Sequence, residues 1–496
     1  MKVELEAGWT EVIRPNVTGM DEKELIRLCD EYMGSKPDRV ESLRADGSAR
    51  RLYRLWAGKR SIIGVANDDA PENTAFLSFS RHFKEEGLAV PEIFAQNPET
   101  TAYLEEDLGD ETLFDALSAQ RPNGGEVPES IQKVYEAVVR ELPRFQVTAG
   151  EGIDDSVCYP RSSFDRQSML WDLNYFKYYF LKLAQVPFHE QHLENDFERL
   201  TGWLLDSPSK FFLYRDFQSR NIMLRDGIPW FIDYQGGRRG ALQYDLASLL
   251  YDAKADLPPD FRMHLRGVYR EALSDVLPGL EDSFDGAFPG FVLMRILQAM
   301  GAYGFRGFYE RKAHFLQSVP YAIRNLESLL SESVFPVELP ELIGALQRVV
   351  RSTRLREIAT VTLLLTVHIQ SFSYKKGLPA DESGHGGGFV FDCRALPNPG
   401  REERFAHLTG DDAATIGWLE QSDEVHAFMN RVRDLINQVV QAYQRRNYTY
   451  LSIGFGCTGG QHRSVYCASS LAQSLEQMAG VKVSLDHRDK PDIDRS

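Results

Sequence analysis

Apolar and polar residues alternate in the first hundred residues in a way that predicts a small β-sheet. Three short runs keep this two-residue period and are separated by turn-forming residues, and two further runs resemble a hairpin. The predicted strands cover residues 39–43, 52–56, 61–65, 91–95 and 101–105. A helical repeat over residues 73–86 lies between the third and fourth strands. We therefore expect a small mixed lobe that ends near Asp107-Leu108-Gly109.

Over residues 112–330 the apolar positions recur mainly at helical spacing. Two short apolar strands interrupt this pattern, at residues 211–214 and 230–233, on either side of a turn at Asp226-Gly227. This region is expected to form a second lobe that is built mostly of helices.

The last third of the chain changes pattern after a proline-containing acidic stretch at residues 331–341. A helix is expected over residues 342–355, which places a linker or helix between domains at 335–358. A long helix begins after Ser422, because apolar residues recur every three or four positions as far as Tyr443. The other expected elements are strands at 360–370, 388–393, 448–454 and 481–485 and a helix at 464–478. This alternation predicts an α/β sandwich domain.

Composition and charge exclude several classes of protein. The chain has 496 residues, with 56 Lys or Arg and 72 Asp or Glu, and its net charge of −16 excludes indiscriminate binding to nucleic acid or anionic membranes. Residues 360–496 carry only −2 of this charge. No apolar run approaches the roughly 18 residues that cross a bilayer. The first residues also lack a signal-peptide pattern, so we expect a cytoplasmic protein with no membrane partner. Five scattered cysteines predict neither a disulfide framework nor structural zinc.

The segment from Tyr214 to Asn221, together with Asp233, has the residue types that phosphoryl transfer needs. Asn221 follows Asp216 by five positions, and Asp233 follows after the predicted hairpin. A carboxylate at Asp216 would orient or deprotonate an acceptor hydroxyl, and oxygens of Asn221 and Asp233 would bind magnesium on nucleotide phosphates. The alternative is that these side chains cap turns beside a hairpin. The combined spacing favours catalysis.

These motifs resemble the aminoglycoside phosphotransferase and choline kinase-like branch of the protein kinase fold. Tyr244-Asp245-Leu246-Ala247 and Asp107-Leu108-Gly109 match further motifs of this branch. The segments around Asp216 and Asp233 are most similar to the anomeric N-acetylmuramate and N-acetylglucosamine kinases of cell-wall recycling. The resemblance implies an α+β, protein-kinase-like two-lobed fold over residues 20–334, with the small lobe reaching to about residue 109.

The same resemblance implies a chemistry and a substrate. It implies ATP and Mg²⁺ as cofactors, and transfer of phosphate to the C1 hydroxyl of an amino sugar. Asp172 lies near the position where similar kinases keep an acidic substrate ligand, and Arg215 is carried as a second candidate for substrate binding.

One departure from the family concerns the lysine that usually holds the α- and β-phosphates from the third strand. Residues 62–66 contain no lysine. Lys59 or Arg60 in the preceding turn, or Arg51 and Arg54 on the neighbouring strand, are candidate substitutes, and each is also compatible with an ordinary solvated charge. The residues Gly47 and Ser48 would let backbone N–H groups approach phosphate, or would form a plain hairpin turn.

A glycine-rich loop lies between the strand at 448–454 and the helix at 464–478. Backbone N–H groups at the start of a helix, with His462 and Arg463 beside them, favour a phosphate or a similar anion. We therefore take Cys457, Gly460 and Ser464 as anion-site candidates. Cys457 and Arg463 also satisfy the Cys-x₅-Arg-Ser spacing of cysteine phosphatases. No Walker lysine follows the glycines, which excludes a nucleotide-binding loop of that kind.

The region from residue 359 to 490 closely resembles the carboxy-terminal domain of the RNase adapter protein RapZ. The match includes residues 371–379, 391–399, 408–410 and 456–466 in the same order. It implies a domain that senses glucosamine-6-phosphate and, in some members, binds regulatory RNA and an RNase. The ligand candidates that it implies are Asp392, Arg394, Thr458, Gly459, His462 and Arg463.

The sequence therefore predicts a small-molecule kinase joined to a phosphosugar-binding domain. Its partners would be an amino sugar and a phosphosugar, with RNA or an RNase as a further partner of the second domain. One alternative is an RNA-binding adapter whose kinase lobe is degenerate, because the strand-three lysine is missing. Another alternative is a phosphatase that uses Cys457 as its nucleophile.

Overall fold

The structure is a computed structural model that describes residues 18–43, 50–121, 124–310, 312–358, 365–379, 388–445, 448 and 450–490. The chain divides into two compact units. The first comprises Met1–Leu181, Val186–Gly301 and Tyr321–Arg351, and the second comprises Lys182–Gln185, Ala302–Pro320 and Ser352–Ser496. Among the described residues, no helix is both long enough and apolar enough to cross a membrane.

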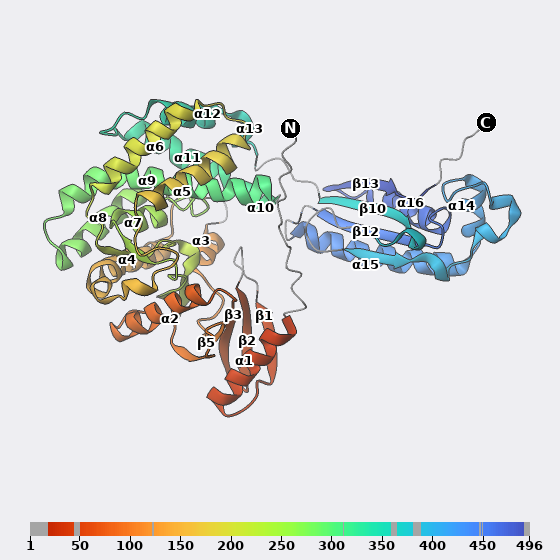
Figure 1. The fold of residues 1–496 in the computed structure, drawn as a ribbon, viewed down its shortest axis with the longest axis horizontal. Helices are drawn as coiled ribbons and strands as arrows, with labels where there is room; N and C mark the ends of the chain where they lie inside the picture. The colour runs from red at the N-terminus through yellow and green to blue at the C-terminus, as the bar shows by residue number, and fades with distance from the viewer. Residues whose placement is uncertain are drawn as a thin grey trace, which may run out of the picture. The chain divides into compact units, whose positions relative to one another are not determined.

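Five antiparallel strands form the sheet of the small lobe, in the order β1-β2-β3-β5-β4 (Figure 1). They are β1 (Arg39–Leu43), β2 (Arg51–Ala57), β3 (Arg60–Ala66), β4 (Ile93–Gln96) and β5 (Ala102–Glu106). Helix α2 (Ala70–Glu85) follows β3. The predicted strands and helix of this lobe are confirmed, whereas helix α1 (Thr18–Met33), which packs against β3, β4 and β5, was not predicted.

Strand β2 shows how the sheet separates a core from a cavity. Successive side chains of a strand point to opposite faces. Tyr53 and Leu55 join the core that includes Leu25 of α1. Leu52 and Arg54 line a cavity on the opposite face. Alternate residues of β2 therefore pack against α1, and the residues between them face the cavity.

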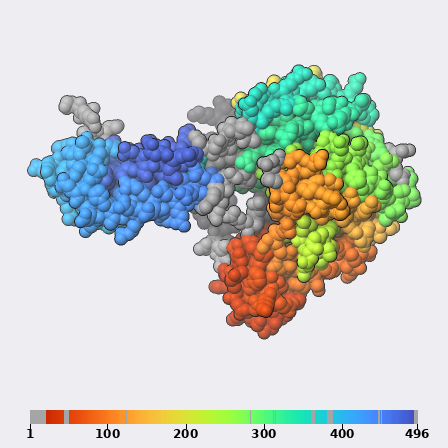
Figure 2. Space-filling view, turned by 180° about the vertical axis from the view of Figure 1, so that it is seen from behind, coloured from red at the N-terminus to blue at the C-terminus, as the bar shows by residue number. Residues whose placement is uncertain are grey.

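The second lobe of this unit is mainly helical, as predicted. Its principal helices are α3 (Leu113–Gln120), α4 (Glu129–Pro143), α5 (Arg166–Tyr175), α6 (Glu190–Leu205), α7 (Gln243–Leu250), α8 (Pro259–Val276), α9 (Glu281–Gly304), α11 (Val319–Glu332) and α12 (Pro340–Arg351). In Figure 2, the part of the surface that is coloured green to teal belongs to the residues from α8 to α12. Helix α12 falls within the segment 335–358, where a helix over residues 342–355 was predicted, and its Leu342 N–H donates to the buried carboxylate of Asp196 on α6 at 2.8 Å.

Two small two-stranded sheets interrupt the helices, and their pairing differs from the prediction. Strand β6 (Phe211–Leu213) pairs with β9 (Arg238–Gly240), and β7 (Ile222–Arg225) pairs with β8 (Ile228–Phe231). The turn at Asp226-Gly227 therefore joins β7 to β8, and the prediction that the strand at 211–214 flanks this turn is wrong. Both turn residues have positive φ, 52° and 76°, and a two-residue turn of this kind needs strands that adjoin it directly.

The second unit contains a four-stranded parallel sheet in the order β11-β12-β10-β13. Its strands are β10 (Leu365–Ser373), β11 (Phe389–Asp392), β12 (Tyr450–Cys457) and β13 (Val481–His487), and its longest helices are α15 (Asp423–Arg445) and α16 (Arg463–Leu475). The alternating residues Val367, Ile369 and Ile453 of one sheet face share a core with both helices. This arrangement confirms the predicted α/β domain.

Candidate active site and anion-binding loop

The loop after β6 carries Arg215 and Asp216 and is anchored by a buried carboxylate. The main-chain N–H groups of Tyr214 and Arg215 donate to Asp245 of α7 at 2.8 and 2.9 Å. Burial raises the pKa of Asp245 to about 6, although these N–H groups and the Gln146 side chain act in the opposite direction. Asp245 thus holds two consecutive peptide groups and sets the position of the Asp216 backbone.

The predicted triad of Asp216, Asn221 and Asp233 is brought together at this loop. The Asn221 side-chain amide donates to the Asp216 carbonyl oxygen at 2.9 Å and to Asp233 Oδ2 at 3.0 Å. Gln235 donates to Asp233 Oδ1 at 2.8 Å. Asp233 has a φ of 71°, which turns the chain sharply after β8. The roles assigned to the three residues stay predictions.

The electrostatics of the triad fit a divalent cation. Burial raises the pKa of Asp233, and the nearby Asp216 carboxylate raises it further. A cation would relieve this repulsion. The hydrogen bonds of Asn221 engage its amide nitrogen and leave the amide oxygen for a metal ligand. Among the described residues no three His, Cys, Asp or Glu side chains form a metal cluster, so a magnesium ion here would depend on phosphate and water oxygens as well.

A cleft of about 620 Å³ lies between the β2–β3 face of the sheet and the loop of the triad. Leu52, Ile63 and Val65 line it from the small lobe, and Met223 and Ile232 line it from the other lobe. Asn221 and Asp233 lie among its polar lining residues. The cleft therefore combines apolar walls with the candidate metal ligands.

The predicted nucleotide-binding residues have different surroundings. Arg54 lines the cleft, where its Nε lies 2.7 Å from Asp107 Oδ2, and a further ion pair joins it to Asp110. Arg51 pairs with Asp21 and Asp68 and does not line the cleft. Gly47 and Ser48 lie outside the described residues.

Arg50 also lines the cleft and was not among the predicted site residues. It precedes β2 by one position, so strand alternation places it on the same side as Leu52 and Arg54. That parity was the signal in the sequence that would have found it. Glu72 on α2 was also missed, and no spacing rule would have singled it out, whereas Asp245 belonged to a recognised motif but had been given no role.

The two substrate-binding candidates contact each other. Both Asp172 carboxylate oxygens accept hydrogen bonds of 2.8 Å from Arg215 Nη2. The Arg215 guanidinium also lies over the rings of Phe164 and Tyr244, at 4.8 and 5.2 Å from their centroids. Burial raises the pKa of Asp172, and Arg215 acts against this shift. The pair holds α5 beside the loop that carries Asp216.

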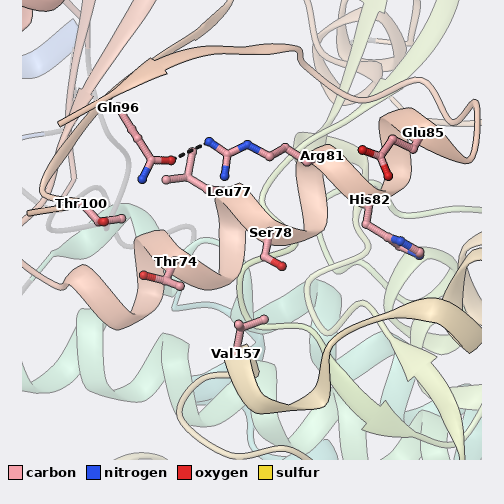
Figure 3. Close-up of a pocket in the computed structure, with 9 residues that line it drawn as sticks. All are labelled: Thr74, Leu77, Ser78, Arg81, His82, Glu85, Gln96, Thr100 and Val157. Atoms are coloured by element: carbon pink, nitrogen blue, oxygen red, sulfur yellow. Dashed lines mark hydrogen bonds between the residues drawn. The ribbon is translucent and has the colours of Figure 1, made fainter. Parts of the chain in front are cut away.

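A second hollow, of about 370 Å³, borders α2, which contributes Ser78 and His82 to its lining (Figure 3). Figure 3 shows Arg81 reaching from the helix to Gln96, with a hydrogen bond of 2.5 Å, and Val157 on the opposite wall. None of the predicted site residues lies in it. The larger cleft is therefore the candidate active site.

The glycine-rich loop of the second unit wraps the Cys457 thiol. Cys457 ends β12 and is buried, its Sγ accepts a hydrogen bond from the Gly460 N–H at 3.2 Å, and it lies 3.1 Å from Ser464 Oγ. Burial acts to raise the pKa of Cys457, but hydrogen bonds from Ser464, Gly460 and Gly459 outweigh it and lower the pKa below its ordinary value. The positive φ of Gly460, 71°, allows the turn that aims these N–H groups inward.

His462 and Arg463 are turned toward the protein. Nε2 of His462 lies 2.9 Å from the Phe405 carbonyl oxygen, and Arg463 Nη1 donates to the carbonyl oxygens of Arg394 and Leu396 at 2.9 and 3.0 Å. Both side chains are buried. They hold the segment between β11 and α14 (Ala413–Leu419) against the loop.

The remaining anion-site candidates are exposed. Thr458 and Gly459 form the exposed tip of the loop. Asp392 and Arg394 form an exposed ion pair of 2.7 Å, and the Arg394 guanidinium lies 4.1 Å from the Tyr374 ring centroid. The structure thus divides the candidates into an outer group and an inner, structural group, and their roles in ligand binding stay predictions.

Comparison with protein families supports both halves of this description. A model of the phosphotransferase enzyme family matches residues 39–282. A model of the RapZ C-terminal domain matches residues 365–491. The first unit is therefore a protein-kinase-like phosphotransferase domain. The chain joins an aminoglycoside phosphotransferase-type domain to a RapZ C-terminal domain, as the two sequence resemblances predict.

Individual relatives cover only part of the chain. A nucleotide-binding protein of Solibacter usitatus is 38% identical over 125 residues, which are 25% of this chain and 37% of that protein. One of Idiomarina loihiensis is 32% identical over 180 residues, which are 36% of this chain and 61% of that protein. The similar solved structures include aminoglycoside phosphotransferase APH(4)-Ia, at 15% identity and a TM-score of 0.42, covering 64% of this chain and 100% of that one. A choline kinase from Cryptosporidium parvum has 12% identity and a TM-score of 0.44, covering 66% and 100%.

Proposed function

We propose that the first unit is an ATP-dependent kinase that phosphorylates a hydroxyl group of a small molecule in the cytoplasm. The observation that carries this proposal is that Asn221 donates hydrogen bonds to the Asp216 carbonyl oxygen and to Asp233, and that Asn221 and Asp233 line the cleft. A base for the acceptor and two oxygen ligands for magnesium are then on adjacent segments, which phosphoryl transfer requires. The match to the phosphotransferase family supports the same reaction class.

In this mechanism the chain positions the reactants and stabilises charge. The Asp216 carboxylate accepts a hydrogen bond from the acceptor hydroxyl and takes its proton as the acceptor oxygen bonds to the γ-phosphorus of ATP, while the bond from that phosphorus to the bridging oxygen breaks and ADP leaves. Asn221 and Asp233 would hold a magnesium ion, which would neutralise charge on the nucleotide phosphates. Leu52 and Ile63 on one side and Met223 on the other form apolar walls that suit a flat nucleotide base.

We further propose that the acceptor is the anomeric hydroxyl of N-acetylmuramate or N-acetylglucosamine. The support is the similarity of the segments around Asp216 and Asp233 to kinases of cell-wall recycling. The test is ATP consumption by the full chain against a panel of amino sugars, in parallel with Asp216→Ala. Turnover with an amino sugar that is lost in the variant supports the proposal, and equal background consumption in both proteins rejects it.

For the second unit we propose binding of a phosphosugar such as glucosamine-6-phosphate. The exposed tip at Thr458 and Gly459, close to the start of α16, supports this proposal because the positive end of a helix favours anions. Asp392 and Arg394 are exposed and supply further polar groups. Calorimetric titration of the full chain with glucosamine-6-phosphate, against glucosamine and inorganic phosphate, tests it. Equal affinity for phosphate alone would reduce the site to a general anion site.

Two other functions of the second unit are testable alternatives. RNA binding would rely on local basic groups such as Lys375 and Lys376, the second of which pairs with Asp489 at 3.4 Å. A phosphatase reaction at Cys457 is favoured by the lowered pKa of its thiol. It is disfavoured by Arg463, which donates to main-chain carbonyls. Hydrolysis of an aryl phosphate that Cys457→Ser abolishes would favour the phosphatase, and its absence would remove that alternative.

A further inference from the structure

Arg50 is a cation that lies close to Asp233 of the candidate metal site. Its Nη1 lies 3.9 Å from Asp233 Oδ1, and its guanidinium lies over the Phe76 ring at 5.5 Å from the centroid. Only 10% of its side chain is exposed. Any phosphate that shares a metal ion with Asp233 would therefore be within reach of this guanidinium.

Helix α2 holds Arg50 in this place. Arg50 Nη2 lies 3.3 Å from Oε1 of Glu72, which is in the first turn of α2. The other oxygen of Glu72 accepts a hydrogen bond of 3.0 Å from Asn67, just after β3. The Glu72 carboxylate is thus fixed at both oxygens. It links the position of Arg50 to that of the helix.

Two other basic residues line the cleft, Arg54 and Arg220, and the Arg220 guanidinium lies over the Phe114 ring at 3.9 Å from its centroid. Arg54 is paired with two aspartates at the edge where β5 ends. Arg51 has the opposite strand parity and pairs with Asp21. Lys59 and Arg60 are exposed at the β2–β3 turn and do not line the cleft. On β3 the cleft-lining residues are Ile63 and Val65, both apolar.

Resting on the kinase function proposed above, we infer that Arg50 binds the nucleotide phosphates in place of the missing strand-three lysine, with Glu72 as its positioning residue. A guanidinium suits this task because it presents several donors in a plane and pairs with two phosphate oxygens at once. Burial opposes the charge of Arg50, but Tyr103, Glu72, Asp233 and Glu105 raise its pKa above the ordinary value, so the cation is retained. In the family the corresponding cation comes from β3, whereas here it comes from the residue before β2.

The first experiment measures binding, so that it does not depend on turnover. The full chain is titrated calorimetrically with ATP, ADP and adenosine in the presence of Mg²⁺. A charge-assisted hydrogen-bond pair contributes enough that Arg50→Ala is expected to weaken ATP and ADP binding by roughly 10- to 100-fold. Adenosine affinity is expected to stay unchanged, and Arg50→Lys is expected to recover part of the loss. Arg39→Ala, on the exposed β1 strand, is the matched control, and all variants are checked for an unchanged Tm.

The result that overturns the inference is an equal loss for adenosine and ATP, or no loss for either. A wild-type chain that binds adenosine as tightly as ATP overturns it as well. If the wild type binds ATP but phosphorylates no acceptor, the kinase function is rejected. The ATP and adenosine affinities of the wild type and Arg50→Ala would still decide whether Arg50 binds the phosphates.

The second experiment separates positioning by Glu72 from general stability. Glu72→Gln is expected to raise KM for ATP while leaving KM for the acceptor unchanged. In a double-mutant cycle, Glu72→Gln is expected to have no further effect on ATP affinity once Arg50 is alanine, because it acts through Arg50. Additive losses in the double variant would contradict the positioning role.

Discussion

The side-chain amide of Asn221 donates a hydrogen bond of 3.0 Å to the carboxylate of Asp233. This contact joins the loop that follows β6 to the end of the β7–β8 hairpin, two segments that lie 12 residues apart in the chain. Because the same amide also holds the Asp216 carbonyl oxygen, the proposed base and the proposed metal ligands move as one group. The first two predictions concern this group.

Replacing Asp216 with Asn should remove the base without removing nucleotide binding. Loss of a general base costs roughly 10²- to 10⁴-fold in rate, so kcat should fall by about that factor. KM for ATP should stay within about threefold of wild type, because the carbonyl oxygen that Asn221 contacts remains. Steady-state kinetics check this prediction. Asp226→Asn in the β7–β8 turn, where Asn also tolerates a positive φ, is the control and should have wild-type kinetics. A kcat for Asp216→Asn close to wild type would show that Asp216 is not the base.

Gln235 should tune the affinity for magnesium through Asp233. Its hydrogen bond lowers the pKa of Asp233 against the effect of burial, so Gln235→Ala should leave this carboxylate harder to ionise. Loss of such a supporting partner costs roughly 10- to 100-fold in metal affinity. The Mg²⁺ concentration for half-maximal activity should rise accordingly. Gln191→Ala on the exposed surface of α6 is the control. An unchanged Mg²⁺ dependence would remove Gln235 from the metal site.

Glu105 should make nucleotide binding depend on pH. Burial raises its pKa to about 8, against the effect of Arg50, and its Oε2 has no hydrogen-bond partner among the described residues. Below pH 8 the carboxyl group is neutral. Above it, the new negative charge faces the phosphates and Arg50, so ATP affinity should fall several-fold as the pH rises through 8.

The raised pKa of Glu105 also makes the free energy of unfolding depend on pH. Between the ordinary pKa of 4.5 and about 8 the unfolded chain is ionised at Glu105 while the folded chain holds a proton. The contribution of Glu105 to the free energy of unfolding is therefore present at low pH and lost as the pH rises through this range. Glu105→Gln should flatten both profiles, measured by ATP titration and urea unfolding from pH 6 to 9. A pH dependence of ATP binding that is identical in Glu105→Gln would contradict this assignment.

The inner and outer residues of the Cys457 loop should give opposite results. Arg463→Ala removes the donor to the carbonyl oxygens of Arg394 and Leu396, of which the second contact is buried, and this should cost about 2–4 kcal/mol of unfolding free energy in the second unit. Thr458→Val at the exposed tip should leave stability unchanged and weaken phosphosugar binding by roughly tenfold, because it removes one hydrogen-bonding hydroxyl. Urea unfolding and calorimetric titration with glucosamine-6-phosphate separate the two. Loss of affinity without loss of stability in Arg463→Ala would place Arg463 at the ligand instead.

Strand periodicity predicted the small lobe, because alternation is a local property of the chain. The same alternation would have chosen Arg50 over Arg51 as a cleft residue, since Arg50 shares the parity of Leu52 and Arg54. Its ion pair with Glu72 depends on how α2 packs against the sheet. Packing of this kind involves residues far apart in the chain and leaves no fixed spacing in the sequence.

The direction of a side chain was harder to predict than its place. The spacing of Cys457, Arg463 and Ser464 correctly located a strand, a tight loop and a helix. It did not reveal that Arg463 donates to the carbonyl oxygens of Arg394 and Leu396, because that choice depends on a segment more than 60 residues earlier. The β7 strand was missed for a related reason, since its short apolar run is recognisable only beside β8.

The central claim is that the cleft with Asp216 transfers phosphate from ATP to the anomeric hydroxyl of an amino sugar. The most direct measurement is ³¹P NMR of the product formed by the full chain from ATP, Mg²⁺ and N-acetylmuramate or N-acetylglucosamine. The account predicts a new phosphorus signal coupled to the anomeric proton of the sugar, formed by the wild type and lost in Asp216→Asn. A signal coupled to a proton at another carbon, or no sugar phosphate while ATP is bound, would contradict it.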